Sequence, residues 1–223
     1  MSEKEKDINI ITLGECGVGK TSIIKRIRDE AFDKEEPTTE FVFSFFNIKK
    51  PYKKLNLTMN LNYHDTAGQE KIISSLPKRY IRNSHIVLLV FSNIQTLNVI
   101  KDRWYKYYKE NANIDNSRFI LIGNKSDIFG DERDEIIKQG NMFAEEIDAH
   151  FMTCSAKSDD NLDNVQRYIE TEAKRYIEKE EKEKSKKVEQ KNGQKQQINS
   201  CKSFRIKDNK TKETKKEKHC CGS

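Results

Sequence analysis

Residues 8–21 read Ile-Asn-Ile-Ile-Thr-Leu-Gly-Glu-Cys-Gly-Val-Gly-Lys-Thr, a mainly apolar run that leads directly into a glycine-rich turn. The last eight residues match the phosphate-loop pattern, which is a glycine, four residues and then Gly-Lys-Thr. Ile23, Ile24 and Ile27 follow at helical spacing, so the turn joins a buried strand to a helix. The glycines let backbone N–H groups point at an anion, and the helix adds its positive dipole end. The sequence therefore predicts a phosphate-binding turn.

Several side chains of this turn have expected roles in binding a nucleotide. Lys20 is expected to reach the β- and γ-phosphates, and the Thr21 hydroxyl is expected to hold Mg²⁺. The other expected nucleotide-binding residues of the turn are Glu15, Cys16, Gly17, Val18, Gly19 and Ser22. The alternative is a glycine-rich turn that binds nothing, and the strand before it and helix after it disfavour that interpretation.

The rest of the chain alternates between predicted strands and helices. Strands are predicted over 41–48, 55–64, 86–91, 119–122 and 151–154, with a turn at 49–54. Helices are predicted over 20–30, around Leu97–Tyr108, over 133–147 and from Leu162 to Tyr176. The continuous apolar run at 86–91 is typical of a central parallel strand. This alternation predicts an α/β sheet with helices on both faces.

Asp65-Thr66-Ala67-Gly68-Gln69 follows the strand that ends at His64. Asp65 is expected to hold Mg²⁺ through water, and Gly68, which lacks a Cβ, can bring its N–H close to the γ-phosphate. Gln69 is expected to orient the attacking water. A further threonine is needed to contact both Mg²⁺ and the γ-phosphate, and Thr38 and Thr39 are the two candidates.

Asn124-Lys125-Ser126-Asp127 follows the predicted strand 119–122 and distinguishes GTP from ATP. The Asp127 carboxylate can accept two hydrogen bonds from guanine, through N1–H and the 2-amino group, whereas adenine would leave the charge unpaired. Ser155-Ala156-Lys157, after the last strand, can add a backbone donor to the guanine O6. Each loop alone is weak evidence, but both lie at the carboxyl ends of strands, where such sheets bind ligands.

With these four stretches in order, the chain resembles the Ras-superfamily small GTPases, and among them most closely the Rab family. The resemblance covers roughly residues 8–178, and the Asn-Lys-Ser-Asp spacing, Trp104 and the C-terminal Cys220-Cys221-Gly222-Ser223 support it. It implies a P-loop NTPase small G domain with a mostly parallel six-stranded sheet. It also implies that Phe32 stacks on the base, that Thr39 in preference to Thr38 is the magnesium-binding threonine, and that Gln69 supports hydrolysis.

Three features depart from the Rab pattern. Glu40-Phe41-Val42-Phe43 replaces the usual run after the threonine, and His64 stands where Rab proteins usually have tryptophan. The hairpin between Phe41 and Asp65 is longer than usual. These positions form much of the surface by which Rab proteins recognise partners, so the resemblance does not fix the effectors or the subfamily.

The charge of the chain is concentrated near its C-terminus. Eleven lysines and Arg205 oppose four acidic residues between Ser185 and His219, which gives this segment a charge of +8 in a chain of net charge +6. The body is therefore slightly acidic, which argues against nucleic-acid binding. We expect residues 1–7 to be a flexible N-terminus, 8–180 the G domain and 181–223 a disordered basic tail.

The adjacent Cys220 and Cys221 resemble a double prenylation signal of the Rab type, with a single-prenyl box at Cys220 as the alternative. Two lipid chains, or one chain with a polybasic stretch, hold a protein firmly to a membrane. No stretch is long and apolar enough for a signal peptide or a spanning helix. The expected location is therefore the cytosol, with reversible attachment to the cytoplasmic face of endomembranes or the plasma membrane.

The four stretches predict a switch that binds GTP and GDP with Mg²⁺, and the resemblance to the Rab family implies that it is a monomer, hydrolyses GTP slowly and regulates vesicle traffic. The resemblance implies an activating protein, an exchange factor, a dissociation inhibitor or escort protein, and effectors as partners. The alternatives are a Ras- or Rho-type signalling GTPase and a nucleotide-binding scaffold with little hydrolysis. Gln69 and Thr39 disfavour the scaffold, and the two terminal cysteines disfavour a GTPase without an anchor.

Overall fold

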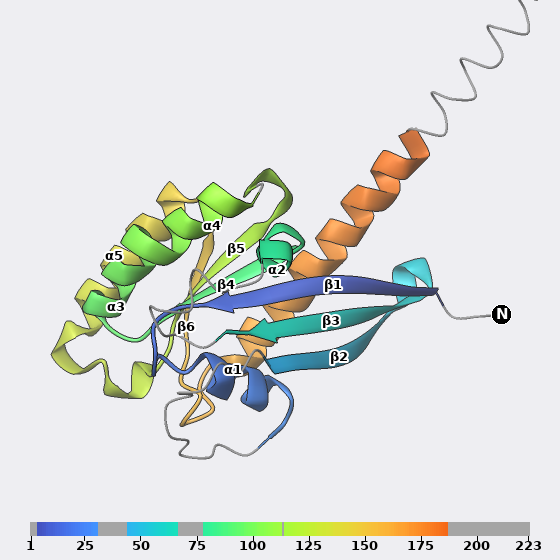
Figure 1. Cartoon of the computed structure of the whole chain (residues 1–223). Coiled ribbons are helices and arrows are strands. Elements are labelled where there is room, and N and C mark those ends of the chain that lie inside the picture. The colour runs from blue at the N-terminus through green and yellow to red at the C-terminus, as the bar shows by residue number, and fades with distance from the viewer. Residues whose placement is uncertain (1–3, 31–43, 67–77, 113, 187–223) are drawn as a thin grey trace, which may run out of the picture. The chain divides into compact units, whose positions relative to one another are not determined.

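The computed structural model describes residues 4–30, 44–66, 78–112 and 114–186 (Figure 1). The chain divides into two compact units, Met1–Tyr176 and Ile177–Ser223. The first unit contains the sheet and all the predicted site residues that the structure describes. The described part of the second unit, residues 177–186, is helical.

Six strands form one sheet in the order β2-β3-β1-β4-β5-β6. Their bounds are Lys4–Leu13 (β1), Ser44–Tyr52 (β2), Leu57–Asp65 (β3), Ile86–Phe91 (β4), Arg118–Gly123 (β5) and His150–Thr153 (β6). All neighbouring strands are parallel except β2 and β3, which form an antiparallel hairpin. The predicted mostly parallel, six-stranded α/β sheet is confirmed.

The named helices are α1 (Lys20–Ile27), α2 (Lys78–Arg82), α3 (Ile94–Val99), α4 (Lys106–Asn111) and α5 (Arg133–Glu146). A π-helical segment, Ile100–Tyr105, joins α3 to α4, and a last helix covers residues 162–186. Short 3-10 turns lie at Lys53–Leu55, Ile114–Asn116, Ser126–Ile128 and Gly130–Glu132. No helix among the described residues is both long and apolar enough to cross a membrane.

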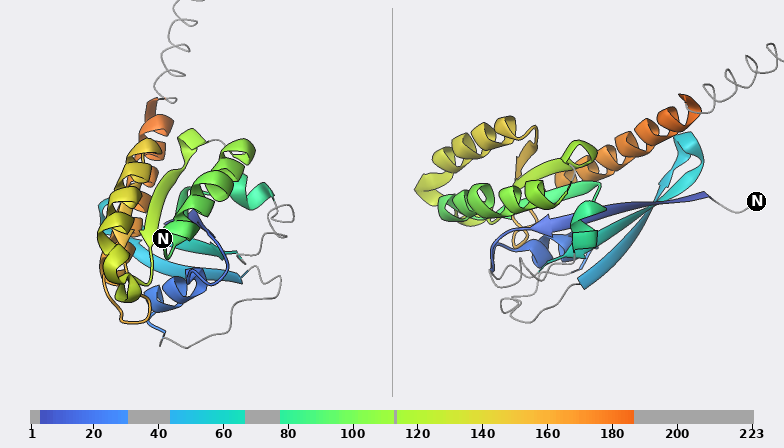
Figure 2. Two further views of the ribbon diagram at one scale, coloured as in Figure 1. Left: turned by 90° about the vertical axis from the view of Figure 1, so that its left-hand side faces the viewer. Right: turned by 45° about the horizontal axis from the view of Figure 1, so that its top comes forward.

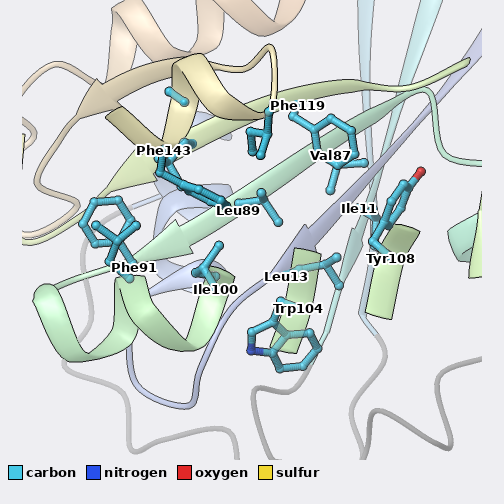
Figure 3. Close-up of a cluster of buried hydrophobic side chains, with 14 of the residues drawn as sticks. Ile11, Leu13, Val87, Leu89, Phe91, Ile100, Trp104, Tyr108, Phe119 and Phe143 are labelled. Carbon is cyan, nitrogen blue, oxygen red and sulfur yellow. The ribbon is translucent and has the colours of Figure 1, made fainter. Parts of the chain in front are cut away.

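Helices pack on both faces of the sheet (Figure 2). One face carries α3, α4 and α5, whose side chains share a buried cluster with strand residues such as Ile11, Leu13 and Leu89 (Figure 3). On the opposite face, the Arg28 guanidinium just after α1 lies 4.8 Å from the ring centre of Phe46. Lys50 on that side of β2 pairs with Glu170 of the last helix at 3.1 Å. Successive strand residues point to opposite faces, so the central strands β1, β4 and β5 contribute buried side chains to both faces of the sheet.

Strand and helix ends differ from the predictions where backbone pairing outweighs side-chain character. Lys4–Asp7, predicted to be part of a flexible N-terminus, instead pair with Leu57–Asn60 of β3 and extend β1. Pro51, predicted to lie in a turn, lies within β2, which is an edge strand and tolerates a residue without an N–H. The hairpin therefore turns at Lys53–Leu55.

Two helices also end elsewhere than predicted. α1 ends at Ile27 and not at Glu30, because Asp29 adopts a left-handed backbone conformation with φ 62°. The last helix continues to residue 186, so that 181–186, predicted to belong to the flexible tail, are helical. Lys184 contacts Glu180 and Glu181 at 3.1 and 3.0 Å, and such pairs one turn apart favour a helix in a segment without apolar residues.

Candidate functional site

Four loops follow the carboxyl ends of four parallel strands. The phosphate loop follows β1, Asp65 ends β3, Asn124–Asp127 follows β5, and Ser155–Lys157 follows β6. Because the carboxyl ends of parallel strands meet at one edge of a sheet, the fold brings the four predicted stretches together at the usual ligand position.

Glycine is required at two positions of the phosphate loop. A Cβ on Gly14 would lie 2.2 Å from the carbonyl oxygen of Val90 on β4, which leaves no room for a side chain. Gly19 has φ 96°, and a Cβ there would lie 2.2 Å from Asn124 Nδ2. The two glycines therefore let the loop approach both β4 and the loop after β5.

Lys20 is the first residue of α1 and is buried, and its side chain points back towards the start of the loop. Its Nζ donates hydrogen bonds to the carbonyl oxygens of Gly14 at 3.0 Å and Glu15 at 2.9 Å. Burial lowers the pKa of Lys20, and the nearby Asp65, Cys16 and Glu15 act in the opposite direction. The ammonium group is thus fixed at the centre of the loop, where an anion would contact the surrounding N–H groups.

The Asp65 carboxylate accepts hydrogen bonds from the hydroxyl groups of two threonines. Thr21 Oγ1 donates to Oδ2 at 2.5 Å, and Thr12 Oγ1 donates to Oδ1 at 3.1 Å. Thr66 Oγ1 in turn donates to the carbonyl oxygen of Thr12 at 2.6 Å. Burial raises the pKa of Asp65, opposed by the hydrogen bond from Thr21 and the charge of Lys20.

The pairing of Thr21 with Asp65 fits a magnesium ion. Both predicted ligands lie within hydrogen-bond distance of each other, and both offer the oxygen atoms that Mg²⁺ prefers. Burial disfavours the charged form of the carboxylate, and a bound cation would offset that cost.

Asn124 connects the phosphate loop to the loop after β6. Its Nδ2 donates to the carbonyl oxygen of Val18 at 2.8 Å, and its Oδ1 accepts from the Ala156 N–H at 3.1 Å. Asn124 is buried, so each of these hydrogen bonds satisfies a group that water does not reach. The sequence predicts that Asn124 binds nucleotide, but its role as a tie between two loops was missed.

The Asp127 carboxylate lies beside the last of the four loops. Ser155 Oγ donates to Asp127 Oδ1 at 2.6 Å, and the same hydroxyl accepts from the Ser158 N–H at 3.1 Å. Lys125 adopts a left-handed conformation with φ 64°, which turns the chain sharply between Asn124 and Asp127. The second oxygen of Asp127 has no hydrogen bond among the described residues, which leaves acceptor capacity for a base.

Two contacts of the site have no sequence motif. Thr12 lies inside a buried strand, and its only signal is a hydroxyl among apolar residues. Glu15 accepts a hydrogen bond from Trp104 Nε1 at 3.1 Å, and the two residues are 89 positions apart. Spacing rules describe neighbours along the chain, so neither contact is predictable from them.

The structure does not test every predicted site residue. Phe32, Thr38, Thr39, Gly68 and Gln69 lie outside the described residues. The same holds for the lipidation candidates Cys220 and Cys221.

Comparison with known proteins identifies the family. The Ras family model matches residues 9–175 of the chain. Ras-related protein RabC of Dictyostelium discoideum is 32% identical over 165 residues, which cover 73% of this chain and 82% of that protein. Ras-related protein SEC4 of Saccharomyces cerevisiae is 32% identical over 163 residues, covering 71% of each chain. RABE1d of Arabidopsis thaliana is 30% identical over 179 residues, or 75% of this chain and 80% of that protein. The chain therefore belongs to the Ras family and is a Rab-like member of the Ras-superfamily GTPases.

Proposed function

We propose that the chain is a GTP/GDP switch that hydrolyses GTP slowly and acts in vesicle and protein transport. The observation that supports this most directly is the pair of hydrogen bonds that the Asn124 side chain makes with the backbone of Val18 and of Ala156. They hold the phosphate loop against the two loops that carry Asp127 and Ala156, so phosphate and base determinants belong to one site.

Guanine is the base that this site suits. The Asp127 carboxylate can accept from guanine N1–H and the 2-amino group. The loop of Ala156 would face O6, and its N–H, which donates to Asn124 Oδ1 in this structure, would turn to the base or share its hydrogen bond with it. Adenine offers an acceptor at N1 and no 2-amino group, so the carboxylate would lose its hydration without gaining a donor. Asp127 is exposed in this structure, so the cost arises when a bound base shields its charge from water without pairing with it, and it is on the order of a few kcal/mol.

The phosphate end has matching chemistry. Lys20 and the backbone N–H groups of residues 15–21 would bind the β- and γ-phosphates. Thr21 and Asp65, with Thr39, would hold Mg²⁺, which when bound neutralises charge on the phosphate oxygens. Ser22 lies in the first turn of α1, next to the phosphate site, and Lys125 and Lys157 belong to the two loops that would contact the base.

We assign hydrolysis to Gln69, which would orient the attacking water, and base stacking to Phe32. In the GTP form, residues around Thr39 and Gly68 would close on the γ-phosphate and recruit effectors, and loss of that phosphate would release them. Cys220 and Cys221, behind the +8 tail, would carry the lipid that attaches the switch to an anionic cytoplasmic membrane surface.

The test is a titration of fluorescent GDP onto the purified Mg²⁺-containing protein, competed with GTP, ATP and XTP. Wild type is expected to release the probe to GTP but not to ATP. Asp127→Asn is expected to lose guanine preference and gain XTP binding, because xanthine has a carbonyl in place of the 2-amino group and an amide N–H can donate to it.

Asp131→Asn is the matched control, since Asp131 is an exposed carboxylate in the turn just beyond the same loop. It should behave as wild type. Equal competition by ATP and GTP in wild type, or no binding of GDP, would contradict the proposed function.

A further inference from the structure

The phosphate loop also contacts a helix outside the four site loops. Its residue Glu15 binds two side chains of Ile100–Tyr105, the segment that joins α3 to α4. Glu15 Oε1 accepts a hydrogen bond from Trp104 Nε1 at 3.1 Å. The same oxygen lies 3.5 Å from Arg103 Nη1, with which it forms an ion pair. Four-fifths of the Glu15 side chain is covered, because its exposed fraction is 20%.

The indole N–H of Trp104 needs an acceptor. Trp104 is fully buried and belongs to the cluster drawn in Figure 3, together with Leu13 and Ile100. The rest of the indole is apolar, so burying the ring in this cluster is costly unless its single N–H finds an acceptor. A carboxylate provides a stronger hydrogen bond than a neutral acceptor does.

The helix changes its winding at this point. α3 and α4 are α-helical, whereas Ile100–Tyr105 between them form the wider π turn. Arg103 and Trp104 both lie in this segment and both contact Glu15. Isolated π turns in α-helices occur frequently at functional sites, which favours a role for this contact beyond packing.

The main chain of Glu15 performs a second task. Its carbonyl oxygen accepts one of the two hydrogen bonds that Lys20 Nζ donates, and Gly14 accepts the other. An ammonium group has three N–H donors, so fixing two directs the third. The side chain of Glu15 thus holds the residue whose carbonyl holds Lys20.

We propose that Glu15 is a positioning residue of the nucleotide site, which Trp104 and Arg103 hold so that its main chain aims Lys20 at the phosphates. This inference rests on the proposed function. It assigns to the α3–α4 helix a direct influence on how long a nucleotide stays bound. Trp104 is the only tryptophan in the chain, so its fluorescence should report the occupancy of the site.

The experiment measures the release rate of fluorescent GDP from the full-length, Mg²⁺-loaded protein. Glu15→Ala removes the anchor and is expected to release GDP about 10-fold faster, the factor that corresponds to about 1.4 kcal/mol. Glu15→Gln keeps an oxygen that can accept from the indole N–H, and should stay closer to wild type than to the alanine variant. Glu145→Ala, at an exposed glutamate of α5, is the control and should match wild type.

A spectroscopic readout separates positioning from a general loss of stability. Stripping GDP from wild type should change the emission of Trp104, and Glu15→Ala should reduce that change at least by half even though it binds GDP. Trp104→Phe deletes the donor, so combining it with Glu15→Ala should release GDP no faster than the faster of the two single variants.

The outcomes distinguish the two proposals. If wild type does not bind GDP, the proposed function is overturned and this inference with it. If wild type binds GDP but Glu15→Ala releases it at the rate of the Glu145→Ala control, only the positioning role is overturned. A Gln variant as fast as the Ala variant would also overturn it, because the acceptor would then be irrelevant.

Discussion

Replacing Asn124 with alanine removes three buried hydrogen bonds, of which the one from Cys154 Sγ, at 3.7 Å, is weak. The Val18 carbonyl would lose its donor, which lies 2.8 Å away, and the Ala156 N–H would lose its acceptor at 3.1 Å. A buried group left without a partner costs about 1–3 kcal/mol. For two such groups we expect a loss of about 3 kcal/mol in the free energy of unfolding, or about 10 °C in Tm for a domain of this size.

The assay is thermal and denaturant unfolding of the nucleotide-free and GDP-saturated protein. The nucleotide-free comparison measures the ties alone. With GDP at about 100 times its Kd, wild type should gain about 2.7 kcal/mol, and Asn124→Ala should gain less at the same concentration because its site is no longer held together.

The control is Asn141→Ala on α5. Asn141 Nδ2 also donates to a backbone carbonyl, that of Ile137 at 3.0 Å, but the residue is exposed to water. Its loss should change stability by no more than about 0.5 kcal/mol. If Asn124→Ala costs no more than this control, the loops keep their geometry without Asn124, and our reasoning on the joined site is refuted.

Three further predictions follow from the geometry of the site. Gly19→Ala should abolish GDP binding in a fluorescence titration, because its Cβ would collide with Asn124, whereas Gly17→Ala, with no atom within 4 Å but φ 75°, should only weaken it. Asp65→Asn should raise the Tm of the nucleotide-free protein at neutral pH and yet weaken Mg²⁺-dependent GDP retention. The pKa of Asp65 is raised in the folded state, so the stability that its protonated form contributes is complete below pH 3.8 and is lost as the pH rises through the raised pKa. The difference in Tm between Asp65→Asn and wild type should therefore vanish below pH 3.8, and a difference that persists there would contradict this prediction. Among the described cysteines, Cys16 is exposed, and burial raises the pKa of Cys154 to about 12. A thiol reagent should therefore modify Cys16 first, and more slowly when GDP is bound, as peptide mapping would show. If Cys154 reacts as fast as Cys16, the loop that covers it opens.

The parts of the fold that were predictable are those in which burial determines residue type. The strand at Ile86–Phe91 has the predicted bounds, since a strand covered on both faces must be apolar throughout. The extension of β1 was not predictable in this way. Glu5 and Asp7 are exposed, and their backbone pairs with β3, so their side chains give no strand signal.

The candidate site also has features that the sequence predicts and features that it does not. The phosphate loop could be recognised because its glycines, Lys20 and Thr21 must occupy fixed positions within eight residues. That the loops of Asp127 and Ser155 lie at the same edge of the sheet could be predicted, because both loops follow the carboxyl ends of predicted strands. Neither kind of information specifies that Asn124 reaches Val18, because that contact depends on how closely two loops approach in space.

Three side chains from three separate elements fix the phosphate loop or the residues that follow it. Asn124 binds its Val18 carbonyl from the loop after β5, Asp65 accepts from Thr21 at the end of β3, and Trp104 holds Glu15 from the α3–α4 helix. Each tie ends on a buried or largely covered group, so none can be broken without exposing or stranding a polar atom. The loop's geometry is therefore a property of the whole sheet and its helices. If the loop binds a nucleotide as proposed, release of that nucleotide would alter the surroundings of all three contacts, and one small ligand would then affect elements far apart in the sequence.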